Sequence, residues 1–496
     1  MMLGTEWNPA LLLAPILLPM LGGGAMLAFP RMDRPDRELF TETAACLTSA
    51  LVFLMLPNVP HGQAATVYSF IGGFSVAFMA DGSSILFAGM VAVMWPLALL
   101  YAFSYMEGEP RQNSFFAFYL MTYGVTLAVA FSANLVTMYV CFEMLTLVTI
   151  PLVSHGGSPD SSHAGYLYAA YCIAGASLAF VAVVMGTLDG SGGFRFGGNL
   201  ASEYPPALMR LVYLFGFIGF GTKAAVFPLY IWLPKASVAP TPVTALLHAV
   251  AVVNSGAFAV MRLTFYAFGP NLLSDSYAQT FCVLLSSFSM VFAAVMALKE
   301  RHFKRRLAYS TMSNLSYILF GISLMTGRGM AGALAHTLFH GVIKMSLFLC
   351  AGAFMRVTGK AYLYEINGQG RRMPFTFAAY TLGALSLTGI PLFCGFVSKW
   401  RLLTAGIAAG TRADFVGVVA LIVSAFLCGM YALSVSVRAF LPPTPDAQYA
   451  ESAAGIREAD WRMLVPIGLF TAANIAFGVW SEPVMTFLDA VSRGAV

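Results

Sequence analysis

The chain has 496 residues, of which 59% are hydrophobic and only 10% are charged, and its mean hydropathy is +0.77. Soluble domains carry about 25% charged residues, so this composition excludes a soluble protein and predicts an all-α polytopic membrane protein. We attribute the formal net charge of +5 to membrane orientation and expect no nucleic-acid partner.

Long apolar runs predict about fourteen transmembrane helices, because a helix needs roughly 20 apolar residues to cross a bilayer. The first run, 11–29, lacks a signal-type cleavage site and is expected to be retained as a span. The segments 59–80, 189–202 and 442–460 are polar or rich in glycine and proline and are expected to be loops. The expected helices are 8–29, 38–57, 81–104, 114–132, 134–154, 164–187, 210–235, 242–267, 277–298, 307–326, 329–355, 374–399, 414–440 and 462–487.

Basic residues are distributed unevenly between the loops. Seventeen Lys and Arg residues fall in loops after odd-numbered helices and seven in loops after even-numbered ones. The positive-inside rule then places the odd loops in the cytoplasm and both termini outside. We expect the cytoplasmic (inner) membrane of a bacterium or archaeon. The basic run 299–306 is a candidate contact for anionic lipid or a cytoplasmic partner.

Two predicted helices are interrupted by proline, one at Pro228 and Pro234 and the other at Pro391. Proline removes a backbone donor and clashes with the preceding turn. Irregular backbone at membrane depth persists only where it lines a cavity or is packed in protein. Lys223 and Lys399 stand beside the two breaks. Two broken helices in corresponding halves indicate a transporter built from two inverted repeats, with a packing kink as the alternative.

Five ionisable residues lie inside apolar runs: Glu143, Lys223, His248, Lys344 and Lys399. A charge near the bilayer centre costs at least about 2.5–3.5 kcal/mol, so such residues are usually functional. We expect Glu143 to pair with Lys223, either as a switchable pair or as a structural one. His248 could instead be a hydrogen-bonding residue of the core, and Lys399 could extend its side chain to the membrane surface.

His336, His340 and Lys344 follow an i, i+4, i+8 spacing, which places them in one stripe on one helical face. Such a stripe could pass a proton through short water bridges, because histidine gains and loses a proton near neutral pH. The alternatives are a zinc site and hydrogen bonding between helices, but no Glu or Cys accompanies the histidines. Lys235 and Lys304 are secondary candidates whose alternative is a solvated loop position.

The seven cysteines form no CxxC pair, and no glycine-rich nucleotide-binding loop lies between a strand and a helix. We therefore expect no cofactor, metal ion or catalytic residue on this chain. Any redox chemistry is expected in another protein.

Five stretches together resemble the antiporter-like family of membrane subunits: 142–144, 221–236, 304–313, 336–344 and 389–399. This family comprises the large proton-pumping subunits of respiratory complex I, the Mrp-type Na+/H+ antiporter subunits and the membrane subunits of energy-converting hydrogenases. The resemblance implies fourteen helices. It divides the chain into helices 1–3 (1–110), a first antiporter-like repeat of helices 4–8 (111–270), a second of helices 9–13 (271–441), and a loop with helix 14 (442–496).

The resemblance also implies a proton pathway of seven residues: Glu143, Lys223, His248, His336, His340, Lys344 and Lys399. In it, separation of Glu143 from Lys223 changes the electric field on Lys344, the central lysine. The proton on Lys344 then moves towards Lys399, near the opposite exit.

Several positions depart from the family pattern. Asn254 stands where many members carry a lysine, His302 where an aspartate is frequent, and Phe142 where a tryptophan is frequent. The sixth expected helix, 164–187, has no acidic residue. Lys399 differs from complex I subunits that end the pathway in glutamate. These departures favour an Mrp-like or hydrogenase-like module, and they make Asn254 a further secondary candidate.

The expected function is therefore proton translocation, or Na+/H+ exchange, by a membrane subunit of a larger complex. The expected partners are H+ or Na+, other membrane subunits including antiporter-like paralogues, a redox module with iron–sulfur clusters, and lipids. The chain is not expected to be an enzyme alone. Three alternatives remain open: a non-conducting scaffold, the membrane subunit of a bicarbonate-uptake complex, and a self-sufficient antiporter.

Overall fold

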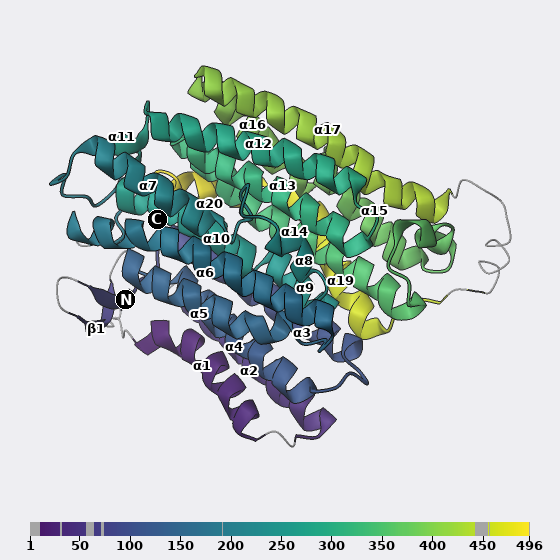
Figure 1. Ribbon diagram of the computed structural model, residues 1–496. Coiled ribbons are helices and arrows are strands. Elements are labelled where there is room, and N and C mark those ends of the chain that lie inside the picture. The colour runs from purple at the N-terminus through teal and green to yellow at the C-terminus, as the bar shows by residue number, and fades with distance from the viewer. Residues whose placement is uncertain are drawn as a thin grey trace, which may run out of the picture.

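The computed structural model describes residues 10–29, 32–55, 64–70, 74–190, 192–441, 455 and 457–495. Its helices lie roughly side by side in one bundle (Figure 1), with α1 and α2 at one edge and α16 and α17 at the opposite edge. The elements of the first half are α1 (Ala10–Ala28), α2 (Arg34–Met55), β1 (Ala65–Ser69), β2 (Ser75–Phe78), α3 (Gly82–Tyr105), α4 (Gln112–Ala130), α5 (Leu135–Val153), α6 (Pro159–Leu188), α7 (Pro206–Gly221), α8 (Trp232–Ala236), α9 (Thr241–Ala249), α10 (Val252–Arg262), the π-helix η2 (Leu263–Phe268) and α11 (Pro270–Leu273). Those of the second half are α12 (Tyr277–Lys299), α13 (Phe303–Ser323), α14 (Gly327–Thr358), the 3-10 helices η3 (Leu363–Ile366) and η4 (Gln369–Arg371), α15 (Pro374–Thr388), α16 (Cys394–Ala409), α17 (Arg412–Phe440), α19 (Trp461–Val479) and α20 (Glu482–Val491).

All fourteen predicted spans contain helix, and the prediction of an all-α membrane protein is confirmed. Within the described residues, 11 helical segments are long and apolar enough to cross a membrane. Three predicted spans are not among these segments. Two are interrupted by proline: one contains α7 and α8, and the other contains α15 and α16. The third is α13, which is more polar. Interrupted or polar spans are the positions at which function is expected in a membrane protein.

The first predicted loop is wrong in its described part, because β1 and β2 form an antiparallel hairpin in which Ala65 pairs with Phe78. Bonds to neighbouring elements hold the hairpin in place: Ala77 N donates to Thr137 Oγ1 over 2.9 Å, and Asn134 Nδ2 donates to Ser75 O over 3.0 Å. The predicted loop 189–202 is irregular where it is described, as expected. Parts of the predictions lie outside the described residues: 8–9, Arg31, 56–63, 71–73, 191, 442–454 and 456.

The core of the bundle surrounds α14, which contacts α3, α9, α10, α13, α15, α16, α19 and α20. The most apolar stretch of α14 is 94% buried, and that of the span 241–268 is entirely buried. By contrast, only 39% of this stretch is buried in α6 and 44% in α17. The segments that carry the predicted histidines and the central lysine are therefore the ones furthest from lipid.

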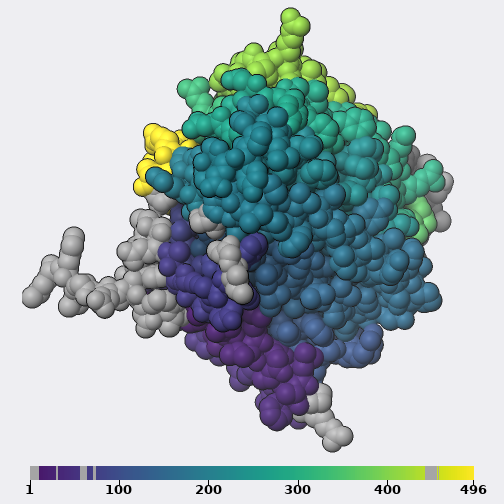
Figure 2. Space-filling view, turned by 60° about the vertical axis from the view of Figure 1, so that its left-hand side comes forward, coloured from purple at the N-terminus to yellow at the C-terminus, as the bar shows by residue number. Residues whose placement is uncertain are grey.

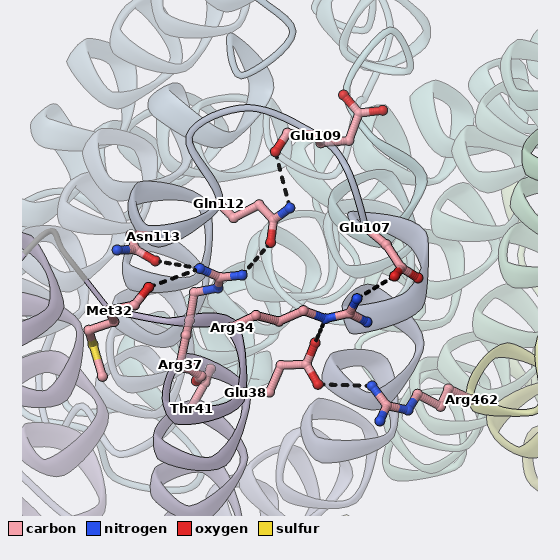
Figure 3. A network of polar contacts seen from close by, with 10 residues as sticks. All are labelled: Met32, Arg34, Arg37, Glu38, Thr41, Glu107, Glu109, Gln112, Asn113 and Arg462. Carbon is pink, nitrogen blue, oxygen red and sulfur yellow. Dashed lines mark hydrogen bonds and ion pairs between the residues drawn. The ribbon is translucent and has the colours of Figure 1, made fainter.

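A polar cluster at one end of the bundle joins segments far apart in the sequence (Figure 3). Arg34 contacts Glu38 over 2.7 Å and also Glu107, while Arg462 at the start of α19 contacts the other oxygen of Glu38 over 2.8 Å. Arg37 donates to Asn113 Oδ1 over 2.9 Å. These residues belong to three connections that the sequence predicts on one side of the membrane, and the structure places them together.

Candidate functional site

The first helix break lies between the end of α7 at Gly221 and the start of α8 at Trp232. Pro228 stands inside it, whereas Pro234 lies within the short α8. Backbone groups released by the break find partners in neighbouring side chains: Trp232 Nε1 donates to Thr222 O over 3.0 Å, and Phe227 N donates to Ser289 Oγ over 3.2 Å. The irregular backbone is thus packed inside protein, as it must be at membrane depth.

Lys223 lies at this break and is completely buried. Its Nζ donates to the carbonyl of Phe142 in α5 and lies 3.5 Å above the centre of the Phe142 ring. Glu143 Oε1 is 3.9 Å from the same Nζ, while the Glu143 side chain is 25% exposed. The predicted pair is therefore present but loose, with the carbonyl and the aromatic face as the closer partners of the ammonium. Phe142 at this position supplies both.

The second break lies between Thr388 at the end of α15 and Cys394 at the start of α16, and it includes the exposed Pro391. Gly389 takes a φ of 97°, a conformation that favours glycine. Lys399 Nζ donates to Leu387 O over 2.6 Å and to Thr388 O over 3.2 Å. The lysine thus occupies the negative end of α15, where the last carbonyls have no helical partner. At 6% exposure it does not reach the membrane surface, which excludes that alternative.

The predicted stripe on α14 is completely or almost completely buried. His336 Nδ1 lies 2.9 Å from Ser398 Oγ on α16, and His336 Nε2 lies 3.2 Å from Asn314 Oδ1 on α13. The rings of His336 and His340 are stacked with their centres 6.2 Å apart. His336 therefore connects α14 to the residue next to Lys399.

Lys344, one turn beyond His340, donates to Leu307 O over 3.1 Å and to Ser310 Oγ, both on α13. His340 Nε2 lies 3.2 Å from His248 O. This carbonyl is available because the span 241–268 has a break between α9 and α10, where Val250 leaves helical geometry with a φ of −135°. No proline or glycine marks this third break, and sequence reasoning missed it.

His248 itself is buried, with Nε2 at 3.5 Å from Ser237 Oγ and its ring stacked on Phe348 at 4.8 Å. Asn254 Nδ2 donates to Ala249 O over 2.7 Å, so this side chain caps the third break. Neither His248 Nδ1 nor Asn254 Oδ1 has a hydrogen-bond partner among the described residues. Both groups can accept a further contact.

The two secondary lysines differ. Lys304 is buried and donates to Ala239 O over 2.8 Å, so its interpretation as a solvated loop residue is wrong. Lys235 is exposed and lines a cavity of about 370 Å³ together with Asp160, His163 and His302. Burial lowers the pKa of His302 to about 4, which leaves this side chain neutral at physiological pH.

Sequence reasoning also missed a buried ion pair at the start of α3, at the opposite end of that helix from Glu107. Arg262, at the end of α10, binds both oxygens of Asp81, the residue that caps α3. Arg262 lies inside the expected helix 242–267 and is completely buried, with its guanidinium 4.4 Å from the centre of the Tyr266 ring. An aspartate before an apolar run signals a helix cap, but nothing local predicts its partner 181 residues away.

In the part of the chain that the structure describes, no three His, Cys, Asp or Glu side chains lie together as metal ligands would. His336 and His340 instead make the separate contacts given above. The hydroxyls and amide that contact the side chains of the row belong to Ser237, Ser310, Asn314 and Ser398. Sequence reasoning does not single them out, because serine and asparagine are common in membrane helices.

Comparisons with known proteins assign the chain to a family. The family model "NADH:quinone oxidoreductase/Mrp antiporter, TM" matches residues 132–428, more than half of the chain, and includes all seven predicted pathway residues. A second model, "NADH-Ubiquinone oxidoreductase (complex I), chain 5 N-terminus", matches residues 70–116. NADH-quinone oxidoreductase subunit N of Desulforudis audaxviator is 32% identical over 417 residues, covering 80% of each chain. A Na(+)/H(+) antiporter subunit of Bacillus subtilis is 24% identical over 97% of this chain and 96% of its own.

Solved structures share the fold. A chain of an archaeal membrane-bound sulfane sulfur reductase superimposes with a TM-score of 0.83 at 21% identity, over 98% of this chain and 97% of its own. A chain of respiratory complex I from Thermus thermophilus gives 0.81 at 22% identity, over 98% of this chain and 100% of its own. The protein is a multi-pass membrane protein that belongs to the NADH:quinone oxidoreductase/Mrp antiporter family of membrane subunits.

Proposed function

We propose that the chain translocates protons as one membrane subunit of a multi-subunit complex. The observation that carries this proposal is the buried row of ionisable side chains between the two broken helices. Lipid and a packed core both penalise such groups, so a row of them is retained for a function that uses charge. The relatives are named as subunits of Na+/H+ antiporters and of NADH-quinone oxidoreductases, which supports a role in ion translocation within an assembly.

The proposed pathway runs from the first repeat, 111–270, into the second, 271–441. Glu143 is the movable partner of Lys223, because its carboxylate is partly exposed and bound only at 3.9 Å. When the carboxylate moves away, Lys223 keeps its carbonyl and its aromatic face, and the potential along the axis becomes more positive. A more positive potential favours release of a proton from Lys344.

The released proton passes along α14 towards Lys399. His340 and His336 lie stacked on this helix, and His336 is within hydrogen-bond distance of Ser398. Water molecules would complete the remaining steps, since bridging waters are nearly as good enthalpically as direct hydrogen bonds. Each charge that crosses works against about 2.3 kcal/mol per 100 mV, so another reaction or ion gradient must drive the cycle.

We further propose that the polar cluster around Arg34 and Arg462 faces the cytoplasm of a bacterium or archaeon, which places both termini outside. The larger share of basic residues in the connections on that side supports this orientation. The driving chemistry belongs to partner subunits, either a redox module with iron–sulfur clusters or antiporter-like paralogues in Na+/H+ exchange. We propose no cofactor for this chain itself.

Lys344→Ala in the assembled complex tests the proposal. Proton movement into proteoliposomes is followed with a pH-sensitive dye, and Lys299→Ala, which removes an exposed lysine at the end of α12, is the matched control. We expect the rate of proton transport to fall at least tenfold in Lys344→Ala and to stay unchanged in the control. Unchanged transport in Lys344→Ala complexes of normal subunit composition would contradict the proposal and favour a non-conducting scaffold.

Mass spectrometry of the native complex distinguishes the driving reactions. Iron–sulfur or nickel subunits would indicate redox-driven pumping, whereas small membrane subunits with antiporter paralogues would indicate Na+/H+ exchange. A zinc-bearing cytosolic subunit would favour bicarbonate uptake. Transport by the single purified chain would overturn the multi-subunit requirement.

A further inference from the structure

Arginine residues gather at one place on the end of the bundle that the sequence predicts outside. This end is poor in basic residues, as the positive-inside rule requires. Three of the few that it has, Arg328, Arg401 and Arg493, line one cavity of about 600 Å³. They come from α14, α16 and the residues after α20, so the fold and not local sequence brings them together. Figure 2 looks towards this end of the molecule, and the yellow C-terminal residues lie at its rim.

The positive charge of this cavity is only partly neutralised. Asp489 is the single acidic residue among its lining residues, and it contacts Arg401 with both carboxylate oxygens at 3.3 Å. Arg493 donates to the backbone carbonyl of Asp489 over 3.1 Å, and no carboxylate contacts its guanidinium among the residues that the structure describes. Arg328 is exposed in the first turn of α14, and no carboxylate contact to it is found among the described residues. Three guanidinium groups against one carboxylate leave a formal excess of two positive charges.

The other walls of the cavity fit a phosphate group attached to an apolar tail. Thr326 and Gly327 form the start of α14, where Thr326 Oγ1 accepts from Gly329 N over 3.1 Å. The N–H groups of Gly327 and Arg328 have no helical partner and favour an anion. The opposite wall is apolar and consists of Ala405, Ala408 and Ala409 of α16. Ile407, beside that wall, is 58% exposed on the surface of the bundle. A polar cavity therefore opens beside an apolar helix at the end of the membrane spans.

We propose that this cavity binds the phosphate headgroup of an anionic phospholipid, with its acyl chains along α16. Guanidinium groups present paired donors that match phosphate oxygens. Basic pockets between membrane helices are suited to lipid headgroups. The apolar wall and the exposed Ile407 favour a lipid over a free anion, because only a lipid uses both surfaces. This inference is independent of proton translocation.

Two exposed arginines provide the test without disturbing the Arg401–Asp489 contact. The complex in detergent is titrated with phosphatidylglycerol, and binding is followed by native mass spectrometry and by the midpoint of thermal unfolding. The variant is Arg328→Gln with Arg493→Gln. The control is Arg412→Gln, which removes an exposed arginine at the start of α17, outside the cavity lining. Phosphatidylcholine and inorganic phosphate are added in parallel.

We expect phosphatidylglycerol to bind and stabilise the unmodified protein and the control, and phosphatidylcholine to do neither. Each basic residue contributes about 1 kcal/mol to anionic lipid binding, so the double variant should bind roughly 30-fold more weakly. Equal binding by the double variant, or equal stabilisation by phosphatidylcholine, would overturn the proposal. Full stabilisation by inorganic phosphate would assign the cavity to a free anion instead. The unfolding midpoint without lipid, which should match that of the control, verifies that the double variant is folded.

Discussion

The two broken helices place a lysine at the same kind of interruption but satisfy it in opposite ways. At the first break, Lys223 reaches across to another helix, where it meets a carbonyl, an aromatic ring and a loosely held carboxylate. At the second, Lys399 turns back onto the carbonyls released by its own break, at 2.6 and 3.2 Å. The first lysine thus has one partner that can move, Glu143, whereas the second is held by backbone carbonyls.

This difference suggests a division of roles between the halves of the molecule. A carboxylate 3.9 Å away can be drawn off by a small side-chain movement, which changes the charge balance at the first break. Backbone carbonyls at the end of a helix cannot leave, so the second break keeps a constant preference for a cation. We infer that the first break responds to the driving partner and that the second receives the proton.

The largest effect is expected from removal of each lysine in turn. Lys223→Met and Lys399→Met should each reduce proton transport at least tenfold, because each removes one end of the row. Their stabilities should differ. Lys223→Met leaves Glu143 without its cation and should cost about 1–3 kcal/mol, the cost of an unpaired buried polar group. Lys399→Met should cost less, because Leu387 O keeps its contact with Cys428 Sγ at 3.3 Å and Thr388 is only half-buried.

Transport assays and thermal unfolding of both variants, in the same assembled complex, measure this contrast. Equal losses of stability would mean that Glu143 is not the distinguishing partner of the first break. Retained transport in Lys399→Met would remove Lys399 from the pathway.

A smaller effect on stability is expected from Glu143→Gln, which keeps the size of the side chain and removes its charge. Lys223 retains the Phe142 carbonyl and ring, so the midpoint of unfolding should change by no more than a few degrees. Transport should nevertheless fall about tenfold or more, because the charge that switches is gone. Stopped transport with unchanged stability supports a switchable pair. A large loss of stability, with a normal transport rate in the protein that remains folded, would identify the pair as structural.

Gly389→Ala tests the role of the backbone at the second break. An added Cβ would lie 3.1 Å from Lys399 Cδ, at a φ of 97° that L residues rarely adopt. We expect a loss of roughly 1–2 kcal/mol and a partial loss of transport, because the carbonyls that hold Lys399 must shift. Gly89→Ala is the control, since its Cβ would meet nothing within 4 Å in the middle of α3. Equal effects of the two substitutions would mean that the geometry of the second break does not influence proton transport.

The fourteen spans, two of the breaks and the buried Lys223, Lys344 and Lys399 could be predicted, because each leaves a local signal of hydropathy, proline or an ionisable residue in an apolar run. The third break, between His248 and Asn254, could not be predicted. It contains no proline or glycine and is stabilised by a side chain of α14. The Asp81–Arg262 pair was missed for the same reason, since its two halves meet only in the folded bundle. The hairpin β1–β2 likewise depends on contacts with α5.

The smallest effect on transport is expected from replacement of Lys235. Comparison with Lys304 tests whether a buried lysine matters more for transport than an exposed one. Lys235→Met removes a solvated charge at the edge of a cavity and should change transport less than twofold. Lys304→Met removes the buried donor to Ala239 O and should reduce transport severalfold, because this carbonyl lies in the segment that positions His248. Transport between pH 6 and 8 by the two variants and by His302→Gln measures the difference. Because the pKa of His302 is about 4, its replacement should leave the pH profile unchanged over that range. A profile displaced by His302→Gln, or a larger defect in Lys235→Met than in Lys304→Met, would place the proton entry in the surface cavity and not along the buried row.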